Sequence, residues 1–447
     1  MASEIILKRK IDADLEEWYC DPEKKPLIIM GCRQCGKTTS VMLFCEKHYK
    51  NIVYIDFFHH PEYIPSFNGS LDVDDIILNL SSRPNTGFNF VPHQTVIVFD
   101  EIQSCPNAIT SLKFFKIDGR YDVISTGSLL GVEGYGEKPV SYPVGFVHNY
   151  KMYPLDFEEF LWANRISDKV IARLKECMDS VTPVPEGIHL NMMDLVKKYI
   201  VVGGMPEAVK EFLKSKQYNK VLNIQRDILI EYRKDMTKYA IGRNIELIKD
   251  CFVSIPKQLA KENKKFQISL LPQKASGVQV SSAIHWLEDA GIVVRCCNLD
   301  LLELPLDGNS IHNIYKVYPA DIGLFISMLE DGTQDDIISG DMATYKGYIY
   351  EGYVADVFSK MNRKCYYFKK NSGLELDFVM RYKGKLTPVE TKSTTGNTKS
   401  LKTVLTNHKT YNVEQAIKLG AYNIGNSAED GKILTLPLYM AFLLRES

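Results

Sequence analysis

The sequence lacks several features that would place it in a special class of protein. It has no stretch of about 18 consecutive apolar residues, the length that a membrane-spanning helix needs. Its first residues lack the apolar core of a signal peptide. No charge sign dominates, because 54 Lys and Arg residues stand against 55 Asp and Glu residues, for a net charge of −1. We therefore expect a cytoplasmic protein with no membrane partner, in which any binding of nucleic acid depends on a local basic patch.

Disulfides, repeats and low-complexity tracts are also not indicated. Ten cysteines are scattered over 447 residues, a usage that favours reduced thiols. We find no internal repeat. Apolar residues make up 45% of the chain and charged residues 24%, which is typical of a folded globular protein. At roughly 150 residues per domain, the length predicts about three domains.

Residues 1–155 alternate short apolar runs with amphipathic segments, a pattern typical of a parallel sheet with crossover helices. None of the apolar runs shows strict polar alternation, which favours a sheet covered on both faces. A helix is expected to open at Lys37, between the first two strands. The strands are expected at 26–30, 51–57, 95–99 and 121–126.

Two regions of different character follow. In residues 156–245 the apolar residues recur three or four positions apart, which predicts a helical subdomain. In residues 246–335 a helix through Leu287, a turn at Gly291 and a strand predict a winged-helix-like region.

Residues 336–447 predict a mixed α/β domain. Helices are expected at 350–361 and 413–419, and the polar run from Ser393 to Thr403 is expected to be a loop. The expected strands cover 365–370, 374–382, 386–393 and 433–441.

One motif carries specific chemistry in the first region. Residues 31–38 fit G-x-x-x-x-G-K-[ST], directly after an apolar strand and directly before a helix, as this phosphate-binding motif requires. Its glycines let backbone N–H groups face one anion, Lys37 would contact the β and γ phosphates, and Thr38 would bind Mg²⁺. An accidental glycine loop is the alternative, and the strand context disfavours it. The predicted ATP-binding residues are Gly31, Cys32, Arg33, Gln34, Cys35, Gly36, Lys37, Thr38 and Thr39.

A carboxylate pair at the end of a buried strand would complete an ATP site. Asp100 would hold Mg²⁺, and Glu101 would orient or deprotonate the water that attacks the γ phosphate. Thr126 or Ser128, at the end of the next strand, would help to position that water, and the choice between them stays open. The catalytic set is therefore Lys37, Glu101, Thr126 and Ser128. A solvated turn is the alternative for the acid pair taken alone.

Two further features of residues 1–245 suggest additional hypotheses. Arg226 and Arg233 could reach a γ phosphate in their own or a neighbouring subunit, although arginines on helices usually lie in solvent or pair with acids. Cys32 and Cys35 also spell C-x-x-C, which leaves an oxidation-sensitive ATPase as a hypothesis.

A second acidic set lies near the C-terminus. Asp377 is followed by a hairpin turn and then by Glu390 and Lys392, which project on one face of an extended strand. Glu351, on the preceding helix, would add a third carboxylate. Such a set can hold a divalent metal through oxygen ligands while the lysine steadies an attacking water. A charged, exposed hairpin is the alternative.

Together these residues resemble a family, the predicted prokaryotic AAA-class P-loop ATPases that carry a C-terminal domain of unknown function with a restriction-endonuclease-like PD-(D/E)xK core. The matching stretches are MGCRQCGKTT, VFDEIQ, STGSLL, YPLDFEEFLWA, VGGMPEAV, WLEDAGIV, KVYPADIGLF, YIYEGYVADVF, LELDFVM and PVETKS.

The resemblance implies a P-loop NTPase fold in the first region and a nuclease-like fold in the last. It implies that Lys37 and Thr38 are the Walker A pair and that Asp100 and Glu101 are the Walker B pair. It also implies that the nuclease-like set is Glu351, Asp377, Glu390 and Lys392. Phe146 departs from the pattern, because a basic residue is expected after Gly145, and this argues against phosphate sensing there.

The leading hypothesis is a Mg²⁺-dependent ATPase that can form a homo-oligomer and whose winged-helix and nuclease-like regions engage DNA. A local basic patch supports it, with only Glu262 opposing. The alternative is an ATP-gated scaffold whose C-terminal domain binds a protein partner and cleaves nothing. A small-molecule kinase is disfavoured by the acid pair and by the long additional regions. The lysines of the patch are Lys257, Lys261, Lys264, Lys265 and Lys274.

Overall fold

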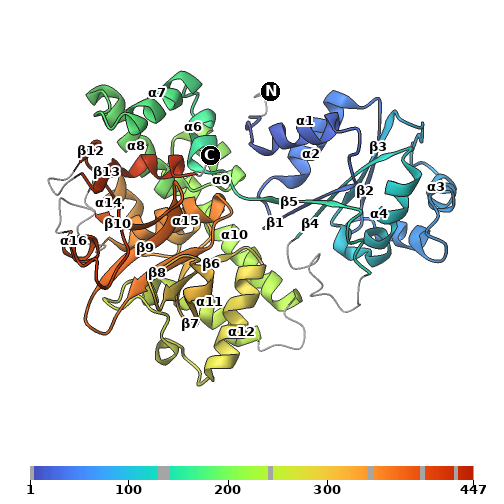
Figure 1. The fold of residues 1–447 in the computed structure, drawn as a ribbon. Coiled ribbons are helices and arrows are strands. Elements are labelled where there is room, and N and C mark those ends of the chain that lie inside the picture. Colours follow the sequence, from blue (N-terminus) through green and yellow to red (C-terminus); the bar gives the residue numbers. More distant parts are fainter. Residues whose placement is uncertain are drawn as a thin grey trace.

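Two sheets organise the molecule, which is described here from a computed structural model (Figure 1). No helix in the described part of the chain is long and apolar enough to cross a membrane. The structure describes residues 5–128, 141–239, 245–340, 347–392, 398–426 and 431–445.

The first sheet is parallel throughout and has the strand order β2-β3-β4-β1-β5. Four of its strands follow the predicted apolar runs. The fifth, β5, was not predicted, because it is an edge strand whose residues are mostly exposed and so form no apolar run. The strands are β1 (Leu27–Gly31), β2 (Asn51–Asp56), β3 (Thr95–Asp100), β4 (Asp122–Ser128) and β5 (His148–Met152).

Helices cover both faces of this sheet, which explains why its strands lack polar alternation. In β3, Val96 and Val98 point into the apolar cluster under α1 and α2, whereas Ile97 and Phe99 point into the cluster under α3 and α4. Successive side chains of a strand therefore both meet apolar partners. The helices are α1 (Ile11–Cys20), α2 (Lys37–His48), α3 (Val73–Ser81) and α4 (Pro106–Asp118).

A helical region follows, as the three-to-four-residue spacing predicts. Its first helix begins at a capping box, in which the Asp156 side chain accepts from the Glu159 backbone N–H and the Glu159 side chain accepts from that of Asp156. The helices are α6 (Phe157–Ala163), α7 (Asp168–Asp179), α8 (Glu186–Val202), α9 (Pro206–Ser215), α10 (Tyr218–Tyr239), α11 (Ile245–Leu259) and α12 (Gly277–Asp289).

The second sheet is mixed and has eight strands in the order β12-β13-β11-β10-β9-β8-β6-β7. After α12 the chain turns at Gly291 into β6, as predicted, but β6 then pairs in parallel with β8. Residues 246–335, which were predicted to be winged-helix-like, therefore share one sheet with the C-terminal region. Its strands are β6 (Val293–Leu299), β7 (Ser310–Pro319), β8 (Cys365–Lys369), β9 (Glu375–Tyr382), β10 (Lys385–Lys392), β11 (Ala416–Gly420), β12 (Gly425–Asn426) and β13 (Ile433–Pro437).

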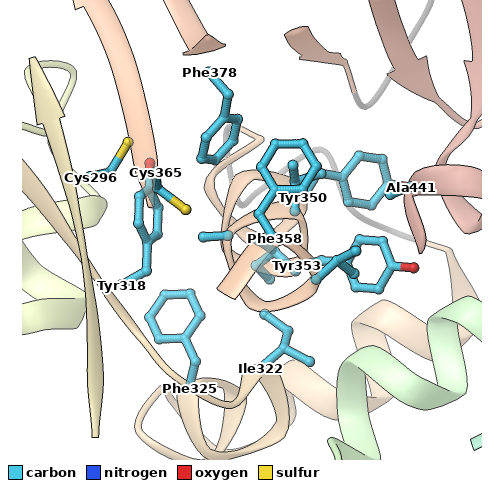
Figure 2. Close-up of a cluster of buried hydrophobic side chains, with 14 of the residues drawn as sticks. Cys296, Tyr318, Ile322, Phe325, Tyr350, Tyr353, Phe358, Cys365, Phe378 and Ala441 are labelled. Atoms are coloured by element: carbon cyan, nitrogen blue, oxygen red, sulfur yellow. The ribbon is translucent and has the colours of Figure 1, made fainter. Parts of the chain in front are cut away.

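The centre of the second core is α15 (Tyr348–Lys360), which is buried along nearly its whole length. Figure 2 shows its side chains Tyr350, Tyr353 and Phe358 surrounded by residues from several elements, among them Phe325 and Phe378. One apolar cluster runs from Leu155 to Leu444, so the helical region and the second sheet form one packed body. The remaining helices are α13 (Ile322–Ser327), α14 (Thr333–Ser339) and α16 (Lys399–Thr406).

Three local predictions in the C-terminal region were wrong. The helix expected at 413–419 is strand β11, which lies between β10 and β13, so pairing on both edges outweighed a short and ambiguous apolar spacing. The expected loop at 393–403 contains the start of α16 at Lys399, while its residues 393–397 lie outside the described residues. The expected strand at 433–441 ends at Pro437 and continues as a 3₁₀ helix.

Candidate functional site

The phosphate-binding loop has the backbone that its glycines permit. Gly36 caps α2 with φ of +98°, a left-handed conformation that glycine adopts without strain. Gly31 ends β1 so close to the neighbouring strand that a Cβ there would lie 2.3 Å from the carbonyl oxygen of Met152. The sequence pattern therefore reports two distinct needs, a positive φ at Gly36 and close backbone approach at Gly31.

Lys37 lies over this loop. Its side chain is 6% exposed, and Nζ donates to the carbonyl oxygens of Gly31, at 3.1 Å, and Cys32, at 2.9 Å. The ammonium is thus held beside the backbone N–H groups that begin α2. A positive charge and a helix N-terminus at one place form a site suited to phosphate.

Asp100, at the end of β3, accepts hydrogen bonds from hydroxyl groups on β2, on β4 and at the start of α2. Its carboxylate is buried and accepts from the hydroxyls of Thr38, at 2.9 Å, and Tyr54, at 2.6 Å. The Thr126 hydroxyl also donates to it. Thr126 therefore contacts the predicted metal ligand directly, whereas Ser128 lies further along β4, in register with Gly31. Tyr54 was missed because a tyrosine in an apolar strand normally indicates only core.

Glu101 follows in a left-handed conformation, with φ of 50°, which is uncommon for a residue that carries a side chain. This bend turns the chain at the end of β3, and the Glu101 N–H donates to Asp100 at 3.1 Å. The Glu101 carboxylate accepts from Gln103 Nε2. The two neighbouring carboxylates therefore have different partners. Asp100 contacts the Thr38 hydroxyl, whereas Glu101 contacts Gln103 beyond the end of β3.

These oxygen atoms fit Mg²⁺. One buried carboxylate and one hydroxyl form the kind of sparse protein ligand set that Mg²⁺ uses when phosphate oxygens and water complete its shell. Within the described ranges no three His, Cys, Asp or Glu side chains are grouped to hold a metal ion by themselves. Any Mg²⁺ at Thr38 and Asp100 would therefore depend on the nucleotide.

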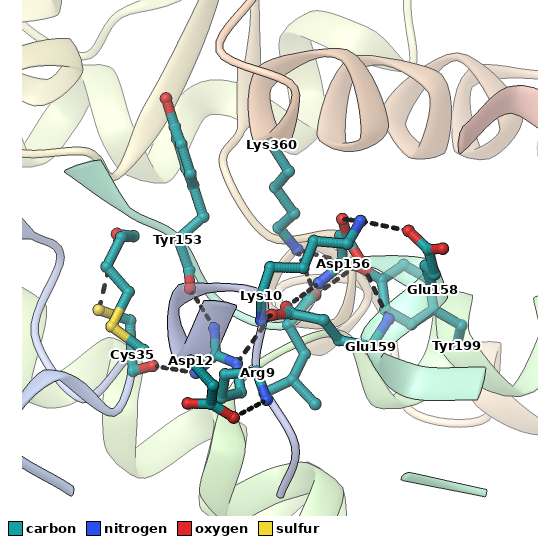
Figure 3. A network of polar contacts seen from close by, with 12 residues as sticks. Arg9, Lys10, Asp12, Cys35, Tyr153, Asp156, Glu158, Glu159, Tyr199 and Lys360 are labelled. Carbon is teal, nitrogen blue, oxygen red and sulfur yellow. Dashed lines mark hydrogen bonds and ion pairs between the residues drawn. The ribbon is translucent and has the colours of Figure 1, made fainter. Parts of the chain in front are cut away.

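Arg9, which no sequence pattern singles out, links the loop to the helical region (Figure 3). Its guanidinium donates to the carbonyl oxygens of Cys35, at 2.8 Å, and Tyr153, at 2.7 Å. It also forms an ion pair with Glu159 at 3.1 Å, and both side chains are 6% exposed. Only the folded structure brings residues 9, 35 and 159 together.

Helix α10 contacts the same loop from the other side. Arg33 forms an ion pair with Asp235 at 2.9 Å, and Gln34 donates to Glu231. The structure does not bring Arg226 to the loop, because its guanidinium pairs with Asp331. Arg233 is exposed on the same helix.

The two loop cysteines are buried free thiols. A hydrogen bond from Cys32 lowers the pKa of Cys35 to about 6 against the opposing effect of burial, with the charges of Lys37 and Arg9 acting in the same direction as the hydrogen bond. That hydrogen bond, with burial, raises the pKa of Cys32. Of the two thiols, Cys35 is therefore the one whose deprotonation is favoured, beside the cations of the loop.

A cleft of about 560 Å³ lies next to the loop. Its walls include Ile5 from the N-terminal segment, Thr39 and Leu43 from α2, and Pro206 from α9. These mostly apolar walls adjoin the loop at Gly36, which places an organic group within reach of a phosphate chain bound at the loop.

The C-terminal acidic set lies in a different environment. Glu351 is buried and pairs with Lys264 and, at 3.5 Å, with Lys316, while Tyr318 donates to it at 3.1 Å. Burial would raise the pKa of Glu351, but the two ammonium groups lower it to about 2. Lys316 was not predicted. It is almost fully buried and also pairs with Glu375 at 3.0 Å.

The other three residues of this set lie nearby on β9 and β10. Asp377 accepts from the backbone N–H of Thr391 at 2.8 Å, and Glu390 pairs with Lys392 at 2.9 Å. Burial and the charge of Glu351 raise the pKa of Asp377, and burial raises that of Glu390. In the described structure Glu390 Oε2 is buried without a hydrogen-bond partner. The strands therefore bring the four residues near one another, but among the described residues the three acids form no group that could hold a metal ion by itself, and two lysines pair with Glu351.

The comparisons with known proteins place a known domain over the residues that form the first sheet. Residues 23–161 match the family model of an AAA domain, and residues 193–335 and 346–439 match domains of unknown function, DUF8612 and DUF4143. No curated protein matches the chain.

Solved structures resemble the chain only distantly. A Walker-type ATPase of Pyrococcus abyssi is 15% identical, covers 72% of this chain and 96% of its own, and has a TM-score of 0.43. The ORC2 protein of Aeropyrum pernix is 12% identical, with coverages of 77% and 98% and a TM-score of 0.36. These values are too low to carry a function across. The family match, together with the loop and the parallel sheet, identifies residues 23–161 as an AAA domain.

Proposed function

We propose that the protein binds ATP together with Mg²⁺ and hydrolyses it. The observation that carries this proposal is the meeting of Thr38, Asp100 and Thr126 beside the Lys37 ammonium, at the carboxyl ends of β1, β3 and β4. In a parallel α/β sheet this edge is where ligands bind. The adjoining cleft supplies room for the nucleoside.

Each residue has a role that follows from its position. Lys37 and the N–H groups at the start of α2 bind and orient the phosphates. Thr38 and Asp100 would hold Mg²⁺, which when bound neutralises charge on the phosphate oxygens. Thr126 fixes the orientation of Asp100 through its hydroxyl. Glu101 accepts a proton from the attacking water, because it is the acid of the pair that is not committed to Thr38.

Two variants test this assignment. We expect Glu101→Gln to keep nucleotide binding and to lower ATP turnover by about 10²–10⁴-fold, the usual contribution of a general base. We expect Lys37→Ala to lose nucleotide binding. Asp75→Asn, an exposed carboxylate of the same domain, is the control and should behave as wild type. Absence of nucleotide affinity in the wild type, or full turnover by Lys37→Ala, would refute the proposal.

We further propose that residues 246–335 and 336–447 engage nucleic acid as winged-helix and nuclease-like regions. The exposed Lys257, Lys261 and Lys274 support this, since none of them pairs with a carboxylate within the described residues. Lys264 no longer belongs to that surface, because it pairs with Glu351. Homo-oligomer formation and the division of the chain into regions 1–155, 156–245, 246–335 and 336–447 remain parts of this proposal.

The scaffold alternative is favoured by one observation, the neutralisation of Glu351 by two lysines. A cleavage assay with Mg²⁺ or Mn²⁺ separates the two readings. Cleavage of DNA by the wild type that is lost in Glu390→Gln supports a nuclease. Absence of DNA cleavage by both proteins, with ATP turnover intact, supports a scaffold.

A further inference from the structure

A large groove lies between the ATPase domain and the C-terminal body, and it shares Lys8, Arg9 and Asp12 with the cleft beside the loop. It has a volume of about 1100 Å³. Its walls come from the N-terminal segment, β5, α6, the end of α15 and β9. Segments that are far apart in the sequence therefore form one surface.

The groove is strongly basic. Eight Lys and Arg residues line it, against two Asp residues. Four of the eight are already neutralised, because Arg9, Lys10, Lys360 and Arg445 form ion pairs with carboxylates. Their charges hold the fold together and are not available to a ligand.

The other four cations are Lys8, Lys151, Arg363 and Arg381, and no carboxylate pairs with any of them within the described ranges. Lys8, Lys151 and Arg381 are exposed, and Arg363 is half-buried, where it donates to the backbone carbonyl of Arg381 at 2.9 Å. Four positive charges on four segments thus face one space. A linear polyanion would satisfy all of them at once.

Aromatic rings lie between these charges. Tyr150, Tyr153 and Trp162 line the groove and are half-buried. The Lys8 ammonium lies 4.3 Å from the centre of the Trp162 ring, and that of Lys151 lies 5.2 Å from the Tyr153 ring. Cations placed among aromatic rings suit a single-stranded nucleic acid. The cations can bind its phosphates, and every base can stack on a ring.

We propose that this groove binds single-stranded nucleic acid. The phosphates would be neutralised by the four unpaired cations, and bases would stack on the tyrosine and tryptophan rings. An acidic peptide would use the charges but gain little from the rings, and a duplex hides its base faces. The inference uses no residue of the Lys257, Lys261 and Lys274 surface and does not depend on ATP hydrolysis.

The groove is also connected to the phosphate-binding loop. Arg9, which lies on its floor, donates to the carbonyl oxygens of Cys35 in the loop and of Tyr153 in the groove wall (Figure 3). Lys10 and Arg445 both pair with Asp156, which joins the N-terminal segment to the C-terminal end of the chain. A strand bound in the groove would therefore lie on the same network that holds the loop.

The test uses the full-length protein and a fluorescent oligo-dT of about 20 nucleotides in an anisotropy titration at several salt concentrations. The groove variant is Lys151→Gln, Arg363→Gln and Arg381→Gln combined. The matched control removes three exposed charges from the helical region, outside the groove and outside the other basic surface, Lys175→Gln, Lys214→Gln and Lys220→Gln combined. ATP turnover and the melting temperature of each variant confirm folding, and Lys151→Gln alone serves if the triple variant fails to fold.

At about 0.7 per neutralised phosphate, four cations give a slope of log K against log salt near −3 for a single strand. We expect the groove variant to bind on the order of tenfold more weakly and to reduce this slope by about 2, with Lys151→Gln reducing it by about 0.7. The control variant should bind as wild type. The proposal is overturned if the wild type does not bind the oligonucleotide, if only the control variant loses affinity, or if a duplex or polyglutamate binds the groove at least as tightly. If the wild type turns over ATP but does not bind the oligonucleotide, this inference is wrong and the ATPase proposal is unaffected.

Discussion

Replacing Arg9 by methionine should both destabilise the ATPase domain and weaken nucleotide binding. The side chain makes two buried contacts, with the carbonyl oxygen of Cys35 and with the Glu159 carboxylate, and a partly buried one with the carbonyl oxygen of Tyr153. Methionine fills a similar volume but leaves a charge unpaired at a site that is 6% exposed. Breaking a buried ion pair in this way costs about 3–5 kcal/mol.

The size of the effect follows from that figure. At about 2–4 °C per kcal/mol for a domain of this size, the melting temperature should fall by about 10 °C. Loss of the donor to Cys35 should also raise the dissociation constant of a fluorescent ATP analogue on the order of tenfold, the equivalent of one buried hydrogen bond. Adding Glu159→Gln should recover part of the stability, because the unpaired charge is then removed.

Scanning calorimetry and a fluorescence titration measure the two effects. The control is Arg173→Met, which breaks the exposed pair with Glu176, whose side chains are 53% and 65% exposed. That change should cost less than about 1 kcal/mol. If Arg9→Met melts within a degree or two of the control and binds nucleotide normally, the guanidinium does not support the loop and the reasoning is wrong.

Three further outcomes are expected. Lys316→Met should lower the melting temperature by several degrees in calorimetry, because it removes the buried ammonium that Glu351 and Glu375 share and leaves only Lys264 and Lys369 to pair with them. The pKa of Glu351 lies at about 2, below its ordinary 4.5, so its stabilising effect is complete above pH 4.5 and is lost as the pH falls towards 2. Wild type should therefore lose more stability than Glu351→Gln on acidification, and parallel melting curves would contradict this. Gly31→Ala should abolish ATP analogue binding in a fluorescence titration, because its Cβ would overlap the carbonyl oxygen of Met152.

Local sequence patterns were sufficient to predict a feature where one physical requirement acts on neighbouring residues. The phosphate-binding loop was predictable because two glycines, a lysine and a threonine must follow one another between a strand and a helix. The acid pair was predictable because it ends an apolar strand. β5 and β11 were not, because an exposed edge strand forms no apolar run and a short apolar segment fits either a helix or a strand.

The sequence by itself determined the chemistry of the chain, that is, the loop, the acid pair, four core strands and the absence of a dominant charge. Only the tertiary structure decided which distant residues complete each site. Arg9 supports the loop, Tyr54 and Thr126 hold Asp100, and Lys316 neutralises Glu351 because folding brings these segments within hydrogen-bond or ion-pair distance. Such contacts leave no periodic signal, since each depends on a single side chain placed by the packing of elements elsewhere in the chain.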